Sequence, residues 1–251
     1  MKKKVIILGA GPVGLVSAWL LSQRNWNVNV FEAKSMVGGM CRSWKWGDFI
    51  LDTGPHIFHT PDKNLWKFWK KEFGKFLVTG KYWSKNTDNK NLHNYYDYPI
   101  SYESINKYPK NLKKKINAEF KMLNNKKKTT STNFHEHVTA QVGSTLTEMF
   151  FKKYPQKVWG IDTKKITSEW APKRIQLRKK IEPFFSEEFT AVGKYGTGSI
   201  YEFIANKIKK NGGKINLNSK VSGIEYKDNK IRKVIINNKK KINIDDNTII
   251  I

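Results

Sequence analysis

The sequence predicts an α/β fold, and three observations support this prediction. Residues 3–34 have the pattern of a strand, a glycine-rich turn, a helix and a second strand. Residues 61–185 carry apolar side chains at helical spacing, and residues 186–251 return to a helix followed by short β-branched runs. We therefore expect a sheet domain made of residues 1–60 and 186–251, interrupted by a mainly helical segment.

The first strand is expected at Val5–Leu8, a short continuous apolar run that is typical of a strand buried on both faces. The helix that follows spans Pro12–Arg24. Its apolar face consists of Leu15, Ala18, Trp19 and Leu21. The second strand alternates through "VNVFE" and ends at Glu32.

Between strand and helix, Gly9, Gly11 and Gly14 fit the pattern Gly-x-Gly-x-x-Gly. Gly9 permits a tight turn, Gly11 lets the backbone approach a pyrophosphate, and Gly14 lets the helix pack close to the strand. Glu32 lies 32 − 14 = 18 residues after Gly14, near the position where a carboxylate accepts hydrogen bonds from an adenosine ribose. A turn that only joins a strand to a helix is the alternative, and the acid favours a dinucleotide.

A second glycine pair, Gly38-Gly39, follows Glu32 and precedes Arg42 in "GGMCR". A backbone and a cation at this place suit closure over the same pyrophosphate. The order of these motifs resembles the flavin-binding start of the amine oxidase and protoporphyrinogen oxidase superfamily, whose cofactor is FAD. The resemblance covers residues 3–60 and implies a Rossmann-like FAD-binding domain of the GR2 type.

Within that superfamily, "GPHIFHT" followed by "DKNLWKF" is most similar to UDP-galactopyranose mutase, a flavoenzyme that contracts a nucleotide-linked sugar ring. The resemblance implies that Gly54, Pro55 and His56 border the isoalloxazine ring, with His56 beside the chemistry and His59 as support. A metal shared by the two histidines is disfavoured, because Gly54-Pro55 opposes a helix there and no carboxylate cluster or cysteine pair completes a site.

In the last third we expect a helix at Ser199–Lys210, stopped by Gly212-Gly213. Further strands are expected at Ile215–Leu217, Val221–Tyr226, Ile231–Asn237 and in a final pair ending in "TIII". The resemblance implies that this is the return to the cofactor domain, where a valine at the position of Val221 meets the adenine through its backbone. The motifs together imply these cofactor contacts: Gly9, Gly11, Pro12, Val13, Gly14, Glu32, Ala33, Gly38, Gly39, Met40, Arg42, Gly54, Pro55, His56 and Val221.

A second resemblance lies in residues 150–178, where "KVWGI" and "SEWAPKRI" are similar to the substrate-domain segment of the mutases and of protoporphyrinogen-oxidase-like flavoproteins. It implies that Trp159 stacks on a uracil and that Arg178 binds a diphosphate, with Arg174 as a second contact. An indole offers a flat stacking face and a guanidinium offers two parallel hydrogen bonds. On the residues alone, a core tryptophan and two solvated arginines remain the alternative.

The rest of the middle segment predicts two helices and a hairpin. The helix within residues 61–74 should bury a face made of Leu65, Phe68, Trp69 and Phe73. The helix within residues 133–154 should bury Phe134, Val138, Leu146, Met149 and Phe150. Residues 81–101 have the aromatic content and turn signals of a hairpin.

Composition disfavours several other classes. The net charge of +26 comes almost entirely from lysines scattered along the chain, and arginine occurs only at Arg24, Arg42, Arg174, Arg178 and Arg232. This favours a solvated surface over specific nucleic-acid recognition, which depends heavily on arginine. Cys41 is the single cysteine, so no internal disulfide can form. No apolar run approaches the ~20 residues of a membrane span and no signal peptide is present, so we expect a soluble cytoplasmic protein.

Three functions remain open from the sequence. The first is an FAD-dependent oxidoreductase acting on a small molecule, in which the flavin accepts a hydride or electrons. The second is a mutase-like flavoenzyme acting on a nucleotide sugar, where reduced flavin acts without net redox turnover. The third is a truncated chain that folds but neither keeps FAD nor turns over. Because the sequence stops inside an apolar run and the superfamily's closing glycine-and-acid strand is not found, we expect the N-terminal part of a longer flavoenzyme.

Overall fold

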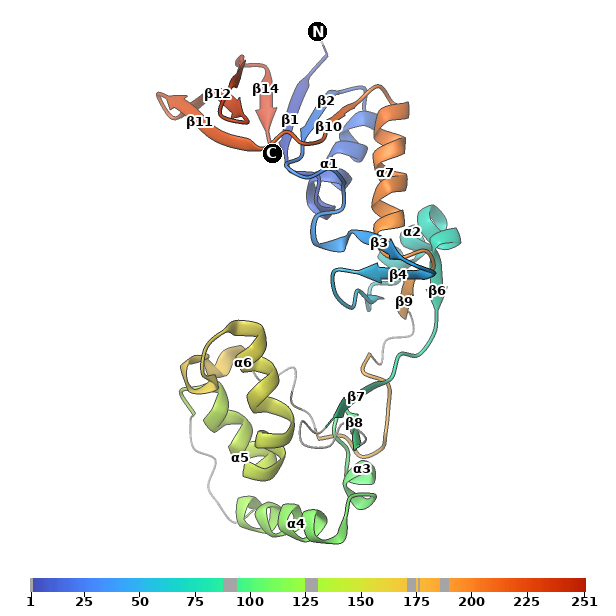
Figure 1. Cartoon of the computed structure of the whole chain (residues 1–251), viewed down its shortest axis with the longest axis vertical. Coiled ribbons are helices and arrows are strands. Elements are labelled where there is room, and N and C mark those ends of the chain that lie inside the picture. The colour runs from blue at the N-terminus through green and yellow to red at the C-terminus, as the bar shows by residue number, and fades with distance from the viewer. Residues whose placement is uncertain (1, 88–93, 125–130, 171–174, 176, 186–189) are drawn as a thin grey trace. The chain divides into compact units, whose positions relative to one another are not determined.

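The computed structural model describes residues 2–87, 94–124, 131–170, 175, 177–185 and 190–251. The chain divides into two compact units (Figure 1). The first unit comprises residues 1–80 together with 187–251, and the second comprises residues 81–186. The first unit is therefore discontinuous in sequence, and the second is inserted into it.

The first unit is built on a parallel sheet of four strands in the order β10-β2-β1-β14. These strands are β1 (Lys4–Leu8), β2 (Asn27–Phe31), β10 (Lys214–Asn216) and β14 (Thr248–Ile250). Strands from both ends of the sequence, blue and red in Figure 1, thus lie side by side in one sheet. The sequence predicted each of these four strands, with ends that differ from the observed ones by no more than a residue or two.

Alternate residues of β1 face two different layers, as the pleat of a strand requires. Val5 and Ile7 are buried in one apolar cluster with the helices α1 (Pro12–Gln23) and α7 (Gly198–Lys210). Ile6 belongs to a second cluster on the other side. A parallel strand covered on both faces explains why β1 is a continuous apolar run.

The second layer is an antiparallel meander of β11 (Val221–Lys227), β12 (Lys230–Ile236) and β13 (Lys240–Asn243). Its Val234 and Ile236 are buried against the sheet. The final pair of strands expected from the sequence is split, since β13 pairs with β12 whereas β14 pairs with β1.

Two smaller sheets complete the first unit. A hairpin pairs β3 (Ser43–Trp46) with β4 (Phe49–Asp52), and an antiparallel sheet has the order β5-β9-β6. The strands of the latter are β5 (Phe58–His59), β9 (Thr190–Gly193) and β6 (Leu77–Thr79). Short 3₁₀ turns lie at Gly39–Cys41 and Gly74–Phe76.

The helix α2 (Lys63–Phe73) buries only part of the expected face, since Trp69 and Phe73 pack inward as expected. Leu65 and Phe68 were expected inside, but they are 44% and 40% exposed. The side chains that pack inward are Trp66, Trp69 and Phe73. Apolar residues occupy two overlapping helical stripes here, and packing on the first unit selects the stripe at i, i+3 and i+7. The structure groups α2 with the first unit, whereas residues from 61 onward were expected in the helical segment.

The second unit is mainly helical with one hairpin. The hairpin pairs β7 (Ser84–Thr87) with β8 (Tyr95–Tyr98), as expected. The helices are α3 (Tyr102–Asn106), α4 (Lys110–Asn124), α5 (Phe134–Leu146), a π-helical turn (Thr147–Lys152) and α6 (Lys153–Trp159), with 3₁₀ turns at Thr163–Lys165 and Ser168–Trp170. Within the described residues, no helix is long and apolar enough to cross a membrane.

The long helix expected over residues 133–154 is interrupted. Gly143 has φ 83° and ψ 166°, which breaks α5, and the π-helical turn follows it. The carboxylate of Glu119 from α4 caps the restarted helix by accepting from the Thr145 N–H at 2.9 Å, the Thr145 hydroxyl at 2.6 Å and the Ser144 hydroxyl at 3.0 Å. The expected buried residues of this segment do lie in the core of the second unit, Met149 only partly.

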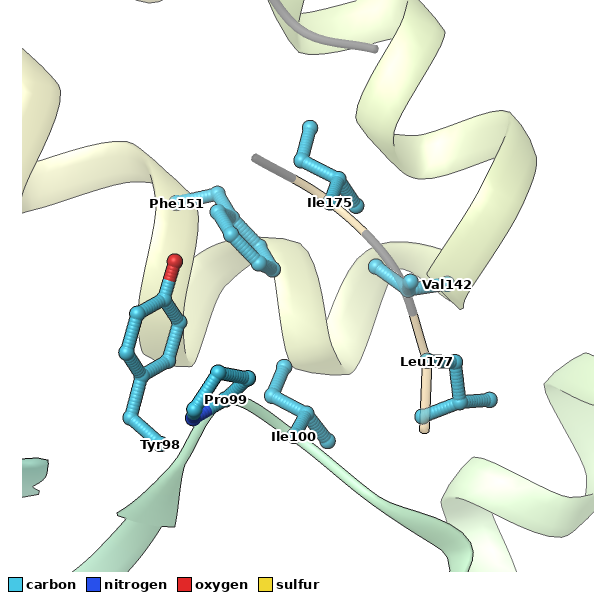
Figure 2. A pocket seen from close by; sticks show the side chains of 7 residues that line it. All are labelled: Tyr98, Pro99, Ile100, Val142, Phe151, Ile175 and Leu177. Carbon is cyan, nitrogen blue, oxygen red and sulfur yellow. The ribbon is translucent and has the colours of Figure 1, made fainter. Parts of the chain in front are cut away.

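A small apolar cavity lies in this core, between the chain after β8, α5 and the segment around residue 175 (Figure 2). Its walls include Ile100, Val142 and Phe151. The cavity holds about 10 Å³, which is room for one water-sized sphere and no larger ligand.

Candidate functional site

The turn between β1 and α1 uses its three glycines in three different ways. Gly9 has φ +113°, which favours glycine, and its N–H donates to the carbonyl of Phe31 at 2.8 Å. A Cβ on Gly14 would overlap the carbonyl oxygen of Gly9, so the helix can lie this close to the turn only without a side chain there. A Cβ on Gly11 would meet nothing within 4 Å. Gly11 therefore borders open space at the start of the helix.

The first turn of α1 presents backbone N–H groups that no side chain caps. Gly11 is the N-cap residue with extended backbone, and Pro12 occupies the first turn. Val13 is 77% exposed, so this end of the helix faces outward. Free amides together with the helix dipole make such an end favourable for an anion.

The second glycine pair lies directly against the first glycine turn. The Gly38 N–H donates to the Ala10 carbonyl at 2.8 Å. A Cβ on Gly39 would stand 3.0 Å from the α-carbon of Gly11. Both members of the pair have positive φ, at 101° and 56°. Two motifs that the sequence assigns to one ligand are thus in contact.

Three more of the expected contacts flank these loops. Ala33 and Met40 are exposed, and Arg42 is half-buried. Among the described residues, no carboxylate lies within ion-pair distance of the Arg42 guanidinium. Its charge is therefore not neutralised by the parts of the chain that the structure describes.

Glu32 is buried at the end of β2, with 8% of its surface exposed. One carboxylate oxygen accepts from the Ala10 N–H at 2.7 Å and the other from the Lys34 N–H at 2.8 Å. Its backbone carbonyl accepts from the Ser219 N–H at 2.7 Å, which brings the start of the strand at Val221 to the same edge. Each carboxylate oxygen retains a lone pair for a further donor.

The segment Gly54, Pro55 and His56 follows β4. The imidazole of His56 is half-buried, and its Nδ1 atom is buried without a hydrogen-bond partner among the described residues. Such an orphan nitrogen calls for an explanation, and a bound group is one. His59 is instead exposed in β5, whose backbone pairs with Thr190. No group of three potential metal ligands occurs in the described parts of the chain.

Sequence reasoning missed a polar network beneath these loops. Asp52, at the end of β4, accepts hydrogen bonds from Ser43 and from Thr197 at the N-terminus of α7. The only signal in the sequence is the glycine-rich "YGTGS" before that helix, because the partners are 197 − 52 = 145 residues apart.

Cys41 is also tied to α7. Burial raises the pKa of its thiol, and a hydrogen bond with Tyr201 opposes that shift without reversing it. Burial likewise raises the pKa of the Tyr201 phenol, and the neighbouring Cys41 adds to the shift. The raised pKa and the hydrogen bond with Tyr201 are typical of a thiol with a structural role.

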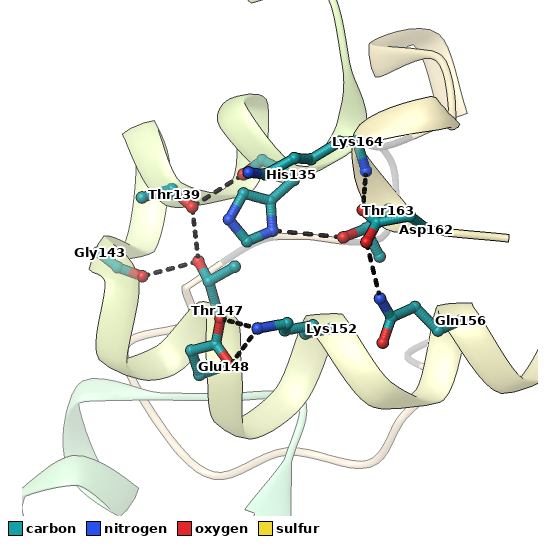
Figure 3. Close-up of polar contacts among 10 residues, drawn as sticks. All are labelled: His135, Thr139, Gly143, Thr147, Glu148, Lys152, Gln156, Asp162, Thr163 and Lys164. Carbon is teal, nitrogen blue, oxygen red and sulfur yellow. Dashed lines mark hydrogen bonds and ion pairs between the residues drawn. The ribbon is translucent and has the colours of Figure 1, made fainter.

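In the second unit, Trp159 ends α6 and is 51% exposed, with its ring edge-on to Trp170 at 5.6 Å between centroids. The loop behind it is held by polar contacts shown in Figure 3. Thr163 and His135 of α5 are 3.3 Å apart between hydroxyl and Nδ1, and Asp162 caps the following 3₁₀ turn. The indole at the end of α6 is thus half exposed and is not a core residue.

The guanidinium of Arg178, which was expected from the sequence to bind a diphosphate, is already engaged by groups of the chain itself. Its guanidinium donates to the carbonyls of Pro183 at 2.7 Å and Phe184 at 3.2 Å and lies 3.5 Å from the carboxylate of Glu182. Within the described residues, no hydrogen bond or ion pair joins it to Trp159. Arg174, the second expected contact, lies outside the described residues.

Comparison with known proteins shows that this chain is similar in sequence to two curated mutases over most of its length. A dTDP-fucopyranose mutase of Escherichia coli is 29% identical over 210 residues, which is 81% of this chain and 54% of that protein. A probable UDP-galactopyranose mutase of Klebsiella pneumoniae is 27% identical over 81% of this chain and 53% of its own length. The chain spans about half the length of the curated relatives it matches.

Solved structures share the fold. Reduced UDP-galactopyranose mutase superposes with a TM-score of 0.77 at 21% identity, covering 96% of this chain and 54% of that one. A putative protoporphyrinogen oxidase from Exiguobacterium sp. superposes with a TM-score of 0.59 at 14% identity, covering 95% of this chain and 57% of that one. Both likenesses confirm the α/β fold that the sequence predicted, and the structure shows that its main sheet is parallel.

The model of the family described as flavin containing amine oxidoreductase matches residues 14–247. This range includes the second glycine pair, the β3–β4 hairpin, the whole second unit and strand β10 of the parallel sheet. The chain therefore belongs to the flavin-containing amine oxidoreductase family, whose cofactor is FAD.

Proposed function

We propose that the first unit binds FAD and that the whole protein is a mutase acting on a nucleotide-linked sugar. The observation that carries the first part is the contact between the two glycine loops at the uncapped N-terminus of α1. A pyrophosphate would lie in the open space beside Gly11, and the guanidinium of Arg42, which pairs with no carboxylate among the described residues, would bind it. The residues present therefore fit FAD.

We assign the remaining FAD contacts as the sequence implies. Glu32 would accept from the ribose hydroxyls of the adenosine, and the backbone at Val221 would meet the adenine. The segment Gly54–His56 would border the isoalloxazine, where a donor or acceptor on the ring would satisfy the buried Nδ1 atom of His56. Ala33 and Met40, which are both exposed, would add contact surface to the cofactor.

The observation that favours a mutase is the extent of the sequence matches. The two relatives that match 81% of this chain are mutases named for dTDP-linked and UDP-linked sugars. The L-amino-acid oxidase of Crotalus adamanteus matches 34% of the chain, and a 4,4'-diapophytoene desaturase of Methylomonas sp matches 21%. Trp159 suits a nucleobase platform, because its indole is 51% exposed and is held nearly perpendicular to the ring of Trp170.

Bound FAD would supply the mutase chemistry in its reduced form, with no net redox turnover. The chain's own part would be to hold the nucleotide at Trp159 and to hold the flavin between the glycine loops and His56. Arg178 is a weaker candidate for the diphosphate, since two carbonyls and Glu182 engage its guanidinium.

An FAD-dependent oxidoreductase acting on another small molecule is the second candidate. The family description favours it, because the matched model is that of an amine oxidoreductase over residues 14–247. The two candidates differ in whether a nucleoside diphosphate binds, and this is the basis of the test.

The test is a titration of the purified chain with FAD, followed by UDP and dTDP. We expect a stoichiometric flavin absorbance band with bound FAD and a perturbation of that band by one of the nucleotides. Trp159→Ala should weaken nucleotide binding about tenfold, as the loss of a stacked base contact implies, and leave FAD binding unchanged. Trp83→Ala removes another tryptophan of the second unit that is 59% exposed, and it serves as the matched control.

Each outcome has a defined meaning. Bound FAD with no response to either nucleotide would overturn the mutase and leave the oxidoreductase. A colourless chain that gains no thermal stability from added FAD would overturn both, in favour of a chain that folds without keeping its cofactor.

A further inference from the structure

The base of the β3–β4 hairpin is fastened to the N-terminus of α7. Ser43 and Asp52 are cross-strand partners at this base, and their side chains are hydrogen-bonded to each other. The Asp52 carboxylate accepts from the Thr197 N–H at 3.1 Å and from the Thr197 hydroxyl at 2.7 Å. The Ser43 hydroxyl accepts from the Gly198 N–H at 2.7 Å. A carboxylate at a helix N-terminus is additionally favoured by the helix dipole.

The backbone before α7 is shaped for this contact. Gly196 has φ +76°, and a Cβ there would crowd Ser43 and Ile50 of the hairpin. A Cβ on Gly198 would also crowd Ser43. Thr197, between these two glycines, is 1% exposed, so its hydrogen bonds are shielded from water. This shielding strengthens them.

The two segments expected at the cofactor, residues 38–42 and 53–56, are each joined in sequence to this hydrogen-bonded hairpin base. Arg42 directly precedes Ser43, and Thr53 directly follows Asp52 on the way to His56. The Thr53 hydroxyl donates to the Arg42 carbonyl at 3.4 Å, which ties the two segments to each other. A shift at the hairpin base would therefore move the pyrophosphate-side cation and the flavin-side histidine together.

We propose that Asp52 is a positioning residue for FAD. Its carboxylate fixes the hairpin base on α7, and through that base it sets the segments 38–42 and 53–56 at the two sides of the cofactor. This role rests on the proposed FAD binding. Asp52 itself need not touch FAD.

The first experiment compares FAD affinity in matched variants. Asp52→Asn places an amide NH₂ among N–H and O–H donors, and we expect FAD to bind about tenfold more weakly with an altered flavin absorbance band. Asp228→Asn makes the same charge change at the exposed turn between β11 and β12 and should bind FAD as the unaltered chain does. Thr197→Val should weaken FAD binding in the same sense as Asp52→Asn, and Thr197→Ser, which keeps the hydroxyl, should restore it.

The second experiment uses amide hydrogen exchange without FAD. In Asp52→Asn we expect exchange in segments 38–42 and 53–56 to become about tenfold faster, while exchange in β1 and β14 stays as in the unaltered chain. Equal acceleration everywhere would show that Asp52 contributes only to general stability, and no acceleration in the two segments would show that it does not position them. Either result overturns the proposal.

The two proposals can fail separately. If the unaltered chain does not bind FAD, the proposed cofactor site is wrong, and the exchange pattern alone then decides whether Asp52 orders the two segments. If the unaltered chain binds FAD and Asp52→Asn binds it equally well, the cofactor site stands and the positioning role is wrong.

Discussion

At the scale of single residues, Gly11 and Gly14 differ in what surrounds them although they are three positions apart. Gly14 faces the carbonyl oxygen of Gly9 and the side chain of Ile7, whereas Gly11 faces open space. One glycine serves the fold and the other is available to a ligand. Substituting each by alanine separates the two functions.

Gly14→Ala should lower the free energy of unfolding by about 1–3 kcal/mol, because the new methyl group forces the helix away from the turn. Gly11→Ala should leave the unfolding of the chain without ligand nearly unchanged, since its backbone at φ −73° and ψ 178° suits alanine. It should nevertheless weaken FAD binding. Thermal unfolding with and without FAD measures both effects, and equal destabilisation by the two variants would contradict the division.

The local part of this site could be predicted from the sequence, and the long-range part could not. Gly9, Gly11, Gly14 and Glu32 belong to one strand–helix–strand unit, so their spacing carries the information. The partnership of Asp52 with Thr197 joins residues 145 apart, and no spacing rule connects them. The hydrogen bonds from Arg178 to the carbonyls of Pro183 and Phe184 could not be predicted either, because they depend on the path of the folded backbone.

At the scale of elements, the break in α5 is stabilised by a side chain of α4. A Cβ on Gly143 would overlap the carboxylate of Glu119, so the glycine and the acid form a matched pair. Burial acts to raise the pKa of Glu119, but the hydrogen bonds from Thr145 and Ser144 outweigh it and hold the pKa below its usual value. The carboxylate therefore stabilises the folded unit in its ionised form.

The sign of the pH effect follows from the lowered pKa. The contribution of Glu119 is fully present above the ordinary carboxyl pKa of 4.5 and is lost as the pH falls through the lower pKa of the folded state. Glu119→Gln should cost the second unit about 1 kcal/mol at neutral pH, with allowance for solvent screening, and less in acid. Amide exchange in α4 and α5 against pH would measure it.

Glu148→Gln is the control for that experiment. Glu148 forms an i, i+4 pair with Lys152 at 2.7 Å and is 51% exposed, and such a surface pair contributes little. A loss of stability in this variant as large as in Glu119→Gln would contradict the capping role. The sequence predicted a helix through this region because its apolar spacing continues across Gly143, and only the packing of α4 shows where the helix restarts.

At the scale of the whole molecule, the net charge of +26 is the dominant electrostatic feature. Like charges repel more in the compact state than in the unfolded chain, and salt screens this repulsion within a Debye length of about 10 Å at 0.1 M. We expect thermal stability to rise as sodium chloride is added at fixed pH. A fall would show that the surface ion pairs, such as Lys4 with Asp245 at 2.6 Å, outweigh the repulsion.

The hairpin presents a second large-scale feature. Ser43 and Asp52 occupy one face at its base, and the opposite face carries Trp44, Trp46, Phe49 and Leu51, which are 37–70% exposed. The alternation of strand residues produces this two-sided character. The polar contacts at the base hold the hairpin in place, so the exposed apolar face is not a loosely attached segment.

The pairing of β1 with β14 has a consequence for the order of events during synthesis. Residues 4–6 must wait for residues 248–250 before the sheet can close on that side, whereas the whole second unit lies between them and can fold earlier. Until then β1 has an unpaired edge, which is the kind of surface on which nascent chains associate wrongly. Contacts so distant in sequence also slow folding. Ribosome-bound chains stalled shortly before residue 248 should therefore show a protected second unit and an unprotected β1, because the edge of β1 is covered only when residues 248–250 have been made.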